Sequence, residues 1–341
     1  MPEPDPTPTE WRQLYAAAAQ IMRIAPWQWM MEDQLFGVQN PDTGEIGFVS
    51  VMGHLGEHLA VAVYRGPRAL YDFLVLHDNP AMAPTSVIEM EQLQVAFGDR
   101  DQLTDRDRRL IKELGLKFRG RQAWPYFRSH RHGHWPWYLE AAEVRFLAQA
   151  LEQAALVIPR MYNDPVLLDS TELDTYLVRV LSRNGDHVSW GDQRMTIPAE
   201  PPPPVTFLMS SELLARVKRL PRKRATLEID YFVLPVPIGS GHERPLLAKM
   251  VLLVDHDTGM VIGSEFLQRE PGVDDPLALI LVAVARLLER SRSRPTRILA
   301  NSPLVAQFVE ILGEELGYTV EVVPYLAQLE AAREFLFDHM M

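Results

Sequence analysis

Three histidines alternate with other residues in one short segment. His130, His132 and His134 are spaced i, i+2, i+4, and on a strand all three side chains would point to the same face. Three imidazoles on one face are a ligand set for a divalent metal such as zinc. Because Trp135-Pro136 ends any strand here, the alternative is a surface loop of exposed histidines. The sequence therefore favours a surface loop of exposed histidines, with a metal site at these three positions as the alternative.

The same region combines positive charge with aromatic rings. Residues 106–134 contain nine Lys or Arg and two Asp or Glu. Aromatic side chains beside a cationic groove are a common way to hold single-stranded nucleic acid. The alternative is a strand with its aromatic face buried and its basic face solvated. The residues that would form the nucleic-acid site are Arg119, Arg121, Trp124, Tyr126 and Arg128.

The composition restricts the classes of function that remain. The 341 residues suggest about two domains, and the absence of cysteine excludes disulfides, thiolate nucleophiles and Cys-ligated metals. A formal net charge of −11 disfavours nucleic acid as a general partner, although a local basic stripe can still bind phosphates. The first residues predict no secretory signal, and the apolar run 277–288 is too short for a bilayer. We expect a cytoplasmic protein without a membrane partner, and a protein partner remains open.

The helices and strands predicted for the first two thirds of the chain follow an α+β pattern. Residues 1–9 contain four prolines and predict a frayed leader. Helical spacing over 10–24 and 140–158, together with alternating runs and a turn at 183–186, predicts an α+β domain over 10–197. Residues 198–224 are rich in proline and then in Lys and Arg, which predicts a linker. Its basic cluster could bind phosphates or pair with the acidic C-terminal domain.

The C-terminal segment 225–341 has a clearer order of elements. Alternating apolar residues predict three successive strands, and helical spacing predicts three later helices separated by two more strands. The predicted order is βββαβαβα, with a mixed five-stranded α/β sheet. The strands are expected at 225–234, 247–254, 260–267, 296–300 and 318–323, and the helices at 276–290, 303–316 and 327–337.

This order resembles the ribonuclease H-like superfamily, and within it the integrase and transposase core. The resemblance implies an Asp in the first strand, a carboxylate after the fourth strand and a Glu on a later helix. Asp230 occupies the first position, Asn301 the second, and Glu334 the third, with Glu330 and Asp255 as further carboxylates nearby. Asn301 departs from the pattern of the active enzymes, because an amide cannot supply the missing negative charge.

The whole chain also resembles a family of bacterial proteins that consist of domains of unknown function. The stretches that carry this resemblance are Pro26-Trp27-Gln28-Trp29-Met30, Leu35-Phe36-Gly37-Val38, Val51-Met52-Gly53 and Pro136-Trp137-Tyr138-Leu139.

Three functions follow. The first is a non-enzymatic binding or scaffolding protein with a degenerate ribonuclease H-like domain and no cofactor. The second is a nuclease dependent on Mg²⁺ or Mn²⁺ through Asp230, Glu334 and either Asp255 or Glu330. The third is a single-strand binder through 106–134.

Overall fold

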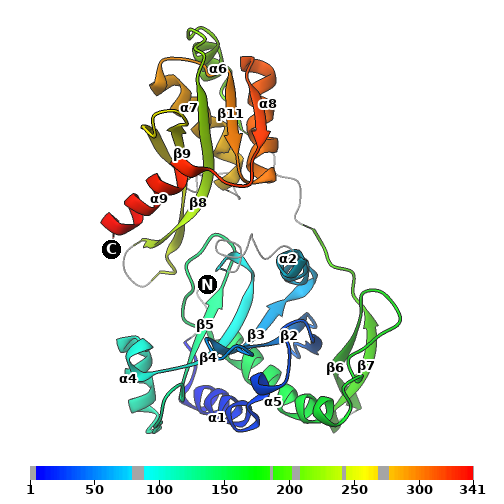
Figure 1. Ribbon diagram of the computed structural model, residues 1–341. Helices are drawn as coiled ribbons and strands as arrows, with labels where there is room; N and C mark the ends of the chain where they lie inside the picture. Colours follow the sequence, from blue (N-terminus) through cyan, green and yellow to red (C-terminus); the bar gives the residue numbers. More distant parts are fainter. Residues whose placement is uncertain are drawn as a thin grey trace. The chain divides into compact units, whose positions relative to one another are not determined.

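The chain folds into two compact units, Met1–Pro202 and Pro203–Met341, each built around its own sheet (Figure 1). This computed structural model describes residues 5–78, 88–184, 187–201, 208–239, 243–267 and 276–340. Residues 1–4 of the expected leader and Gly185-Asp186 of the expected hairpin turn lie outside the described residues.

The first unit contains a seven-stranded sheet in the order β5-β4-β3-β2-β1-β6-β7. Neighbouring strands are antiparallel except β1 and β6, which are parallel. This mixture of helices and strands agrees with the expected α+β pattern. The strands are β1 (Phe36–Gln39), β2 (Ile46–Met52), β3 (Leu59–Arg65), β4 (Gln92–Gly98), β5 (Trp124–His130), β6 (Thr175–Asn184) and β7 (His187–Thr196).

Helices cover both faces of this sheet. The long helices α1 (Pro8–Ile24) and α5 (Ala141–Asn163) bury their apolar faces with one face of the sheet. Helix α2 (Gly66–Asp78) packs into a smaller apolar cluster with Phe48 and Tyr64. Helix α4 (Asp105–Glu113) follows a 3-10 turn, Arg100–Gln102, beside the edge strand β5 (Figure 1).

Local capping explains where α1 and α4 begin. The Thr7 hydroxyl accepts the Glu10 N–H at 3.3 Å, and the Glu10 carboxylate accepts the Thr7 N–H at 2.7 Å. Thr104 and Asp107 form the same reciprocal box at the start of α4. Because α1 already begins at Pro8, the leader expected over residues 1–9 is shorter than predicted.

The second unit contains a five-stranded mixed sheet in the order β10-β9-β8-β11-β12. The first three strands in this order are antiparallel, and β8, β11 and β12 run parallel. A long meander is thus followed by two crossovers through helices. The strands are β8 (Thr226–Ile238), β9 (Leu246–Asp255), β10 (Val261–Leu267), β11 (Arg297–Ala300) and β12 (Thr319–Val322).

Four helices complete the second unit: α6 (Ser211–Lys218), α7 (Ile280–Ser291), α8 (Pro303–Leu316) and α9 (Ala327–Met340). Helices α6, α7 and α8 share one apolar core with the sheet, and α9 packs into another on β8 and β9. Leu213 and Val217 of α6 are buried in the first of these cores. The segment 198–224 is therefore not a linker throughout, because α6 belongs to the second unit.

The alternation along β8 places two carboxylates on the same side as α9. Phe232 and Leu234 of β8 are buried in the core that contains α9, and Glu228 and Asp230 precede them at the same period of two. None of the described helices is both long and apolar enough to cross a membrane.

Candidate functional site

Asp230 lies in β8, one residue beyond the pairing of Ile229 with Ala300 of β11. Its Oδ1 accepts the backbone N–H of Tyr231 at 2.8 Å. Burial raises the pKa of Asp230 to about 6, against the lowering effects of the Tyr231 N–H and the Arg333 charge. The charge of Glu330 adds to the increase. Asp230 is therefore a half-buried carboxyl group that is costly to ionise.

Helix α9 brings Glu330, rather than Glu334, to Asp230. Glu330 is ion-paired with Arg333 one turn along the helix, and both charges act on the pKa of Asp230. Glu334 is exposed, and no described interaction joins it to Asp230. Of the two glutamates on α9, the structure relates Glu330 to Asp230 electrostatically, and a role for Glu334 at the site stays a prediction.

Asn301 follows β11 and binds the loop before α9. Its Nδ2 donates to the carbonyl oxygens of Val323 at 3.2 Å and Pro324 at 2.7 Å. Two carbonyl acceptors require a donor, which an ionised carboxylate cannot provide. The amide therefore has a structural role at the position where the resemblance implies a metal-binding carboxylate.

Asp255, the other carboxylate considered from the sequence, shapes the turn between β9 and β10. Its Oδ1 accepts the Thr258 hydroxyl at 2.7 Å and the Thr258 N–H at 2.9 Å. These hydrogen bonds lower the pKa of Asp255. Its Oδ1 is thus engaged in turn formation.

A buried glutamate that the sequence reasoning missed holds the start of α9. Glu228 is 1% exposed, and its Oε2 accepts the Leu329 N–H of the first helical turn at 2.8 Å. Its Oε1 lies 2.6 Å from Nδ1 of His256. The available signal was its position two residues before Asp230, on the same face of β8. Glu228 fixes the helix that carries Glu330 and Arg333.

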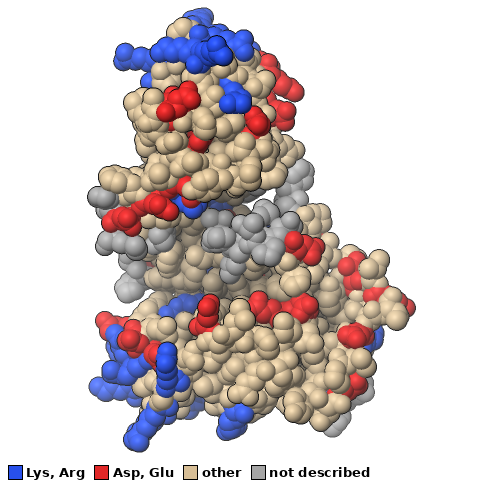
Figure 2. Space-filling model, viewed as in Figure 1, with Lys and Arg blue, Asp and Glu red and all other residues tan. Residues whose placement is uncertain are grey.

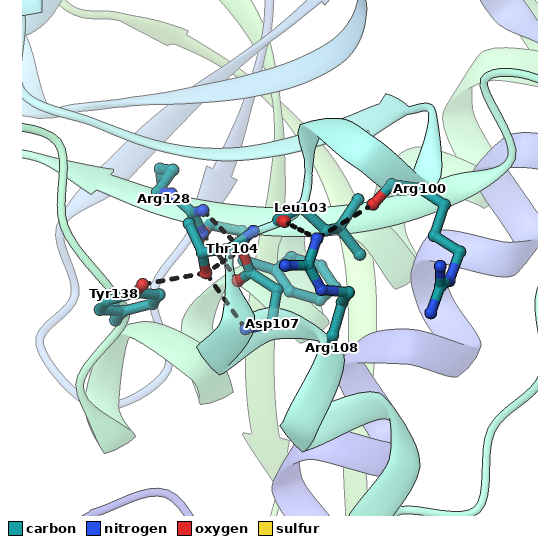
Figure 3. Close-up of polar contacts among 8 residues, drawn as sticks. Arg100, Leu103, Thr104, Asp107, Arg108, Arg128 and Tyr138 are labelled. Carbon is teal, nitrogen blue, oxygen red and sulfur yellow. Dashed lines mark hydrogen bonds and ion pairs between the residues drawn. The ribbon is translucent and has the colours of Figure 1, made fainter.

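In the first unit, the basic and aromatic residues divide into two groups. Arg128 is 15% exposed and donates to Asp107 at 2.9 and 2.7 Å (Figure 3). Its guanidinium lies 5.3 Å from the ring centroid of Tyr126 and 5.0 Å from that of Tyr138. Burial tends to raise the pKa of Asp107, but hydrogen bonds from Arg128 and Thr104 outweigh it and lower that pKa. Arg128 thus forms an internal ion pair with Asp107, and its guanidinium lies against the Tyr126 ring.

The other candidates surround a surface groove. Arg119 and Trp124 line a hollow of about 870 Å³ between α4, the turn before it and the loop that leads to β5. Arg121 is 89% exposed, with its Nε 3.9 Å from Asp99, and does not line the groove. The basic residues that sequence reasoning did not select are Arg100, Arg108, Arg109, Lys112 and Lys117. The basic residues of α4 were the signal for Arg108, Arg109 and Lys112.

The three histidines do not share one strand. His130 is the last residue of β5 and is buried, whereas His132 and His134 lie in the following turn. His134 Nδ1 lies 2.9 Å from the carbonyl oxygen of His132. Among the described residues, no group of three or more His, Asp or Glu side chains could hold a metal ion. Because β5 ends at His130, the i, i+2, i+4 spacing does not place the three histidine side chains on one face of a strand.

The linker basic cluster, residues 216–224, is partly neutralised within its own unit. Arg216 pairs with Glu289 at 2.7 Å, and Lys218 pairs with Glu315. This agrees with the interpretation that the cluster pairs with acidic residues of the C-terminal domain. Arg219, Arg222, Lys223 and Arg224 remain exposed.

Comparison with known proteins gives a match for each unit. Residues 11–179 match a domain of unknown function, DUF7309, and residues 213–337 match a second domain of unknown function, DUF6930. A search of curated proteins finds no match. The expectation of domains of unknown function is thus confirmed, since one such domain is matched in each unit.

Proposed function

We propose that the chain is a non-enzymatic binding protein whose second unit is a ribonuclease H-like domain without a working metal site. The sequence of elements from β8 to α9 and the strand order β10-β9-β8-β11-β12 support this relationship. Fold alone does not assign an activity. The arrangement of charges around Asp230 therefore carries the functional part of the proposal.

The single observation that carries the proposal is the position of Arg333. Cleavage by two metals requires carboxylates that surround two cations about 4 Å apart. Here Arg333 is ion-paired with Glu330 and acts electrostatically on Asp230. The residues present therefore do not fit a divalent pair: a guanidinium supplies the positive charge, and the second position of the carboxylate pattern is the amide of Asn301.

A metal titration of the full chain tests this proposal. We expect the protein to leave the electron paramagnetic resonance signal of Mn²⁺ unchanged at about 1 mM metal, since weak carboxylate sites bind in that range. The double variant Asn301→Asp/Arg333→Ser restores a third carboxylate and removes the competing cation, so it should bind Mn²⁺. Glu334→Gln is the matched control on α9 and should change nothing.

Two outcomes would contradict the proposal. Stoichiometric Mn²⁺ binding by the natural chain that disappears in Asp230→Asn would support the nuclease alternative. Mn²⁺-dependent cleavage of an oligonucleotide, lost in the same variant, would establish it.

A further inference from the structure

The groove beside α4 concentrates positive charge in a protein whose net charge is −11. Its charged lining contains six cations and one carboxylate, Asp105, which is paired with Arg108 at 2.6 Å. In Figure 2, Lys and Arg side chains gather over the region where Figure 1 places α4. The six cations are Arg100, Arg108, Arg109, Lys112, Lys117 and Arg119.

Four of these cations form no ion pair with any residue that the structure describes. Among the described residues, no ion pair involves Arg109, Lys112, Lys117 or Arg119, all of which line the groove. Arg128, from the same basic segment, is instead neutralised by Asp107. Like charges that surround one hollow repel one another, and a bound polyanion would relieve that repulsion.

Aromatic rings provide the second feature of the groove. Trp124 and Phe118 are half-buried and line it, with ring centroids 5.9 Å apart. The Arg100 guanidinium lies 6.0 Å from the ring centroid of Trp124. An aromatic surface next to cations is suited to a base and its phosphates together. An acidic peptide would use the cations and gain nothing comparable from the rings.

We propose that this groove binds single-stranded nucleic acid, with the cations of α4 and its flanking loop on the phosphates and a base against Trp124. The inference names a partner for the binding role proposed above and rests on that role. It concerns the first unit, so the Mn²⁺ titration of the second unit can fail without affecting it.

Fluorescence anisotropy with a labelled oligothymidine of about 15 nucleotides tests the charge requirement in the full chain. Each lost phosphate contact should reduce the slope of log affinity against log salt by about 0.7. We therefore expect Arg109→Gln/Lys112→Gln to weaken binding at low salt and to reduce that slope by about 1.4. Arg23→Gln/Arg183→Gln is the matched control, because it removes the same charge from exposed positions of the first unit that do not line the groove.

Two substitutions at Trp124 test stacking. Trp124→Leu should weaken binding about tenfold, within the range measured for loss of one stacked base, whereas Trp124→Phe should retain most of the affinity. Circular dichroism of each variant separates a lost contact from a lost fold. This pair also distinguishes nucleic acid from an acidic peptide, since a peptide has no base to stack.

The proposal is overturned if the oligonucleotide does not bind at low salt, or if the groove and control variants weaken binding equally. Equal affinity for polyglutamate, with no effect of Trp124→Leu on either ligand, would assign the groove to acidic peptides. If nucleic acid binds as expected but the natural chain also holds Mn²⁺ at Asp230, only the non-enzymatic proposal fails.

Discussion

Asp107 in the first unit and Asp230 in the second are both withdrawn from solvent near an arginine, yet their pKa values move in opposite directions. Asp107 accepts hydrogen bonds from the Arg128 guanidinium and from both the hydroxyl and N–H of Thr104. Asp230 accepts the Tyr231 N–H, and Arg333 is ion-paired with Glu330 instead. The pKa of Asp107 falls, whereas that of Asp230 rises to about 6.

The difference shows that donors, rather than the mere presence of a cation, decide whether a buried carboxylate is stable when charged. Asp107 has a structural role in the first unit, because hydrogen bonds from Arg128 and Thr104 offset the cost of burying its charge. Ionised Asp230 destabilises the folded second unit at neutral pH. A perturbed carboxyl group of this kind is typical of a functional position rather than a structural one. Three substitutions test this contrast, beginning with the largest effect.

Asp107→Asn should lower the free energy of unfolding of the first unit by about 3 kcal/mol, because it leaves Arg128 charged and enclosed without its partner. All seven tryptophans lie within residues 11–190, so tryptophan fluorescence during urea denaturation reports on this unit alone. The loss should be largest above pH 4. Since the pKa of Asp107 is lowered below its usual 3.8, its contribution disappears as the pH falls and the carboxylate protonates.

The control for this measurement is Asp105→Asn, two residues earlier in the same helix. Asp105 is 84% exposed and pairs with Arg108 at 2.6 Å, so solvent screens the interaction and little stability should be lost. If both variants lose the same stability, Asp107 has no special structural role and the contrast with Asp230 fails.

Asp230→Asn should have the opposite sign and stabilise the second unit by about 2 kcal/mol at pH 8. A native pKa of about 6 lies above the ordinary 3.8, so the folded state binds the proton more tightly than the unfolded state. Stability is therefore lost as pH rises from about 4 through 6 and is constant above that range. The neutral amide avoids the loss, and the advantage of Asp230→Asn should vanish near pH 4.

The second unit contains no tryptophan, so its unfolding can be distinguished from that of the first unit by comparing two signals. An unfolding transition detected by circular dichroism but not by tryptophan fluorescence belongs to this unit. Glu334→Gln, at an exposed position on α9, controls for the general loss of a negative charge. Destabilisation by Asp230→Asn at pH 8 would mean that the Asp230 carboxylate is stabilised in its charged form. That result would contradict the contrast with Asp107.

Periodicity in the sequence was enough to place Asp230 in the first strand of the second unit. It could not select between Glu330 and Glu334, because residues four apart lie on one face of a helix. The choice is made by the docking of α9, whose first turn is held by Glu228, one hundred and one residues away from Leu329. A tertiary contact of this kind leaves no local pattern.

The same limit applies in the first unit. Arg128 was counted with the basic residues available to a ligand, but its partner Asp107 lies 21 residues earlier and approaches it only when α4 packs beside β5. His130, His132 and His134 alternate in sequence, yet Ser129 pairs with Trp137 across a chain reversal that begins after β5. Alternation predicts a shared face only as far as the strand extends.

The smallest expected effect concerns Asn301, where the resemblance implies a carboxylate. Asn301→Asp should destabilise the second unit by about 1 kcal/mol at pH 8, because a carboxylate cannot donate to the Val323 and Pro324 carbonyls. At pH 3 the protonated carboxyl regains one donor, so part of the loss should be recovered. Asn301→Ala removes the donors without adding charge and should show no such recovery. If Asn301→Asp is as stable as the natural chain at pH 8, the amide has no structural role, and its presence beside Asp230 needs another cause.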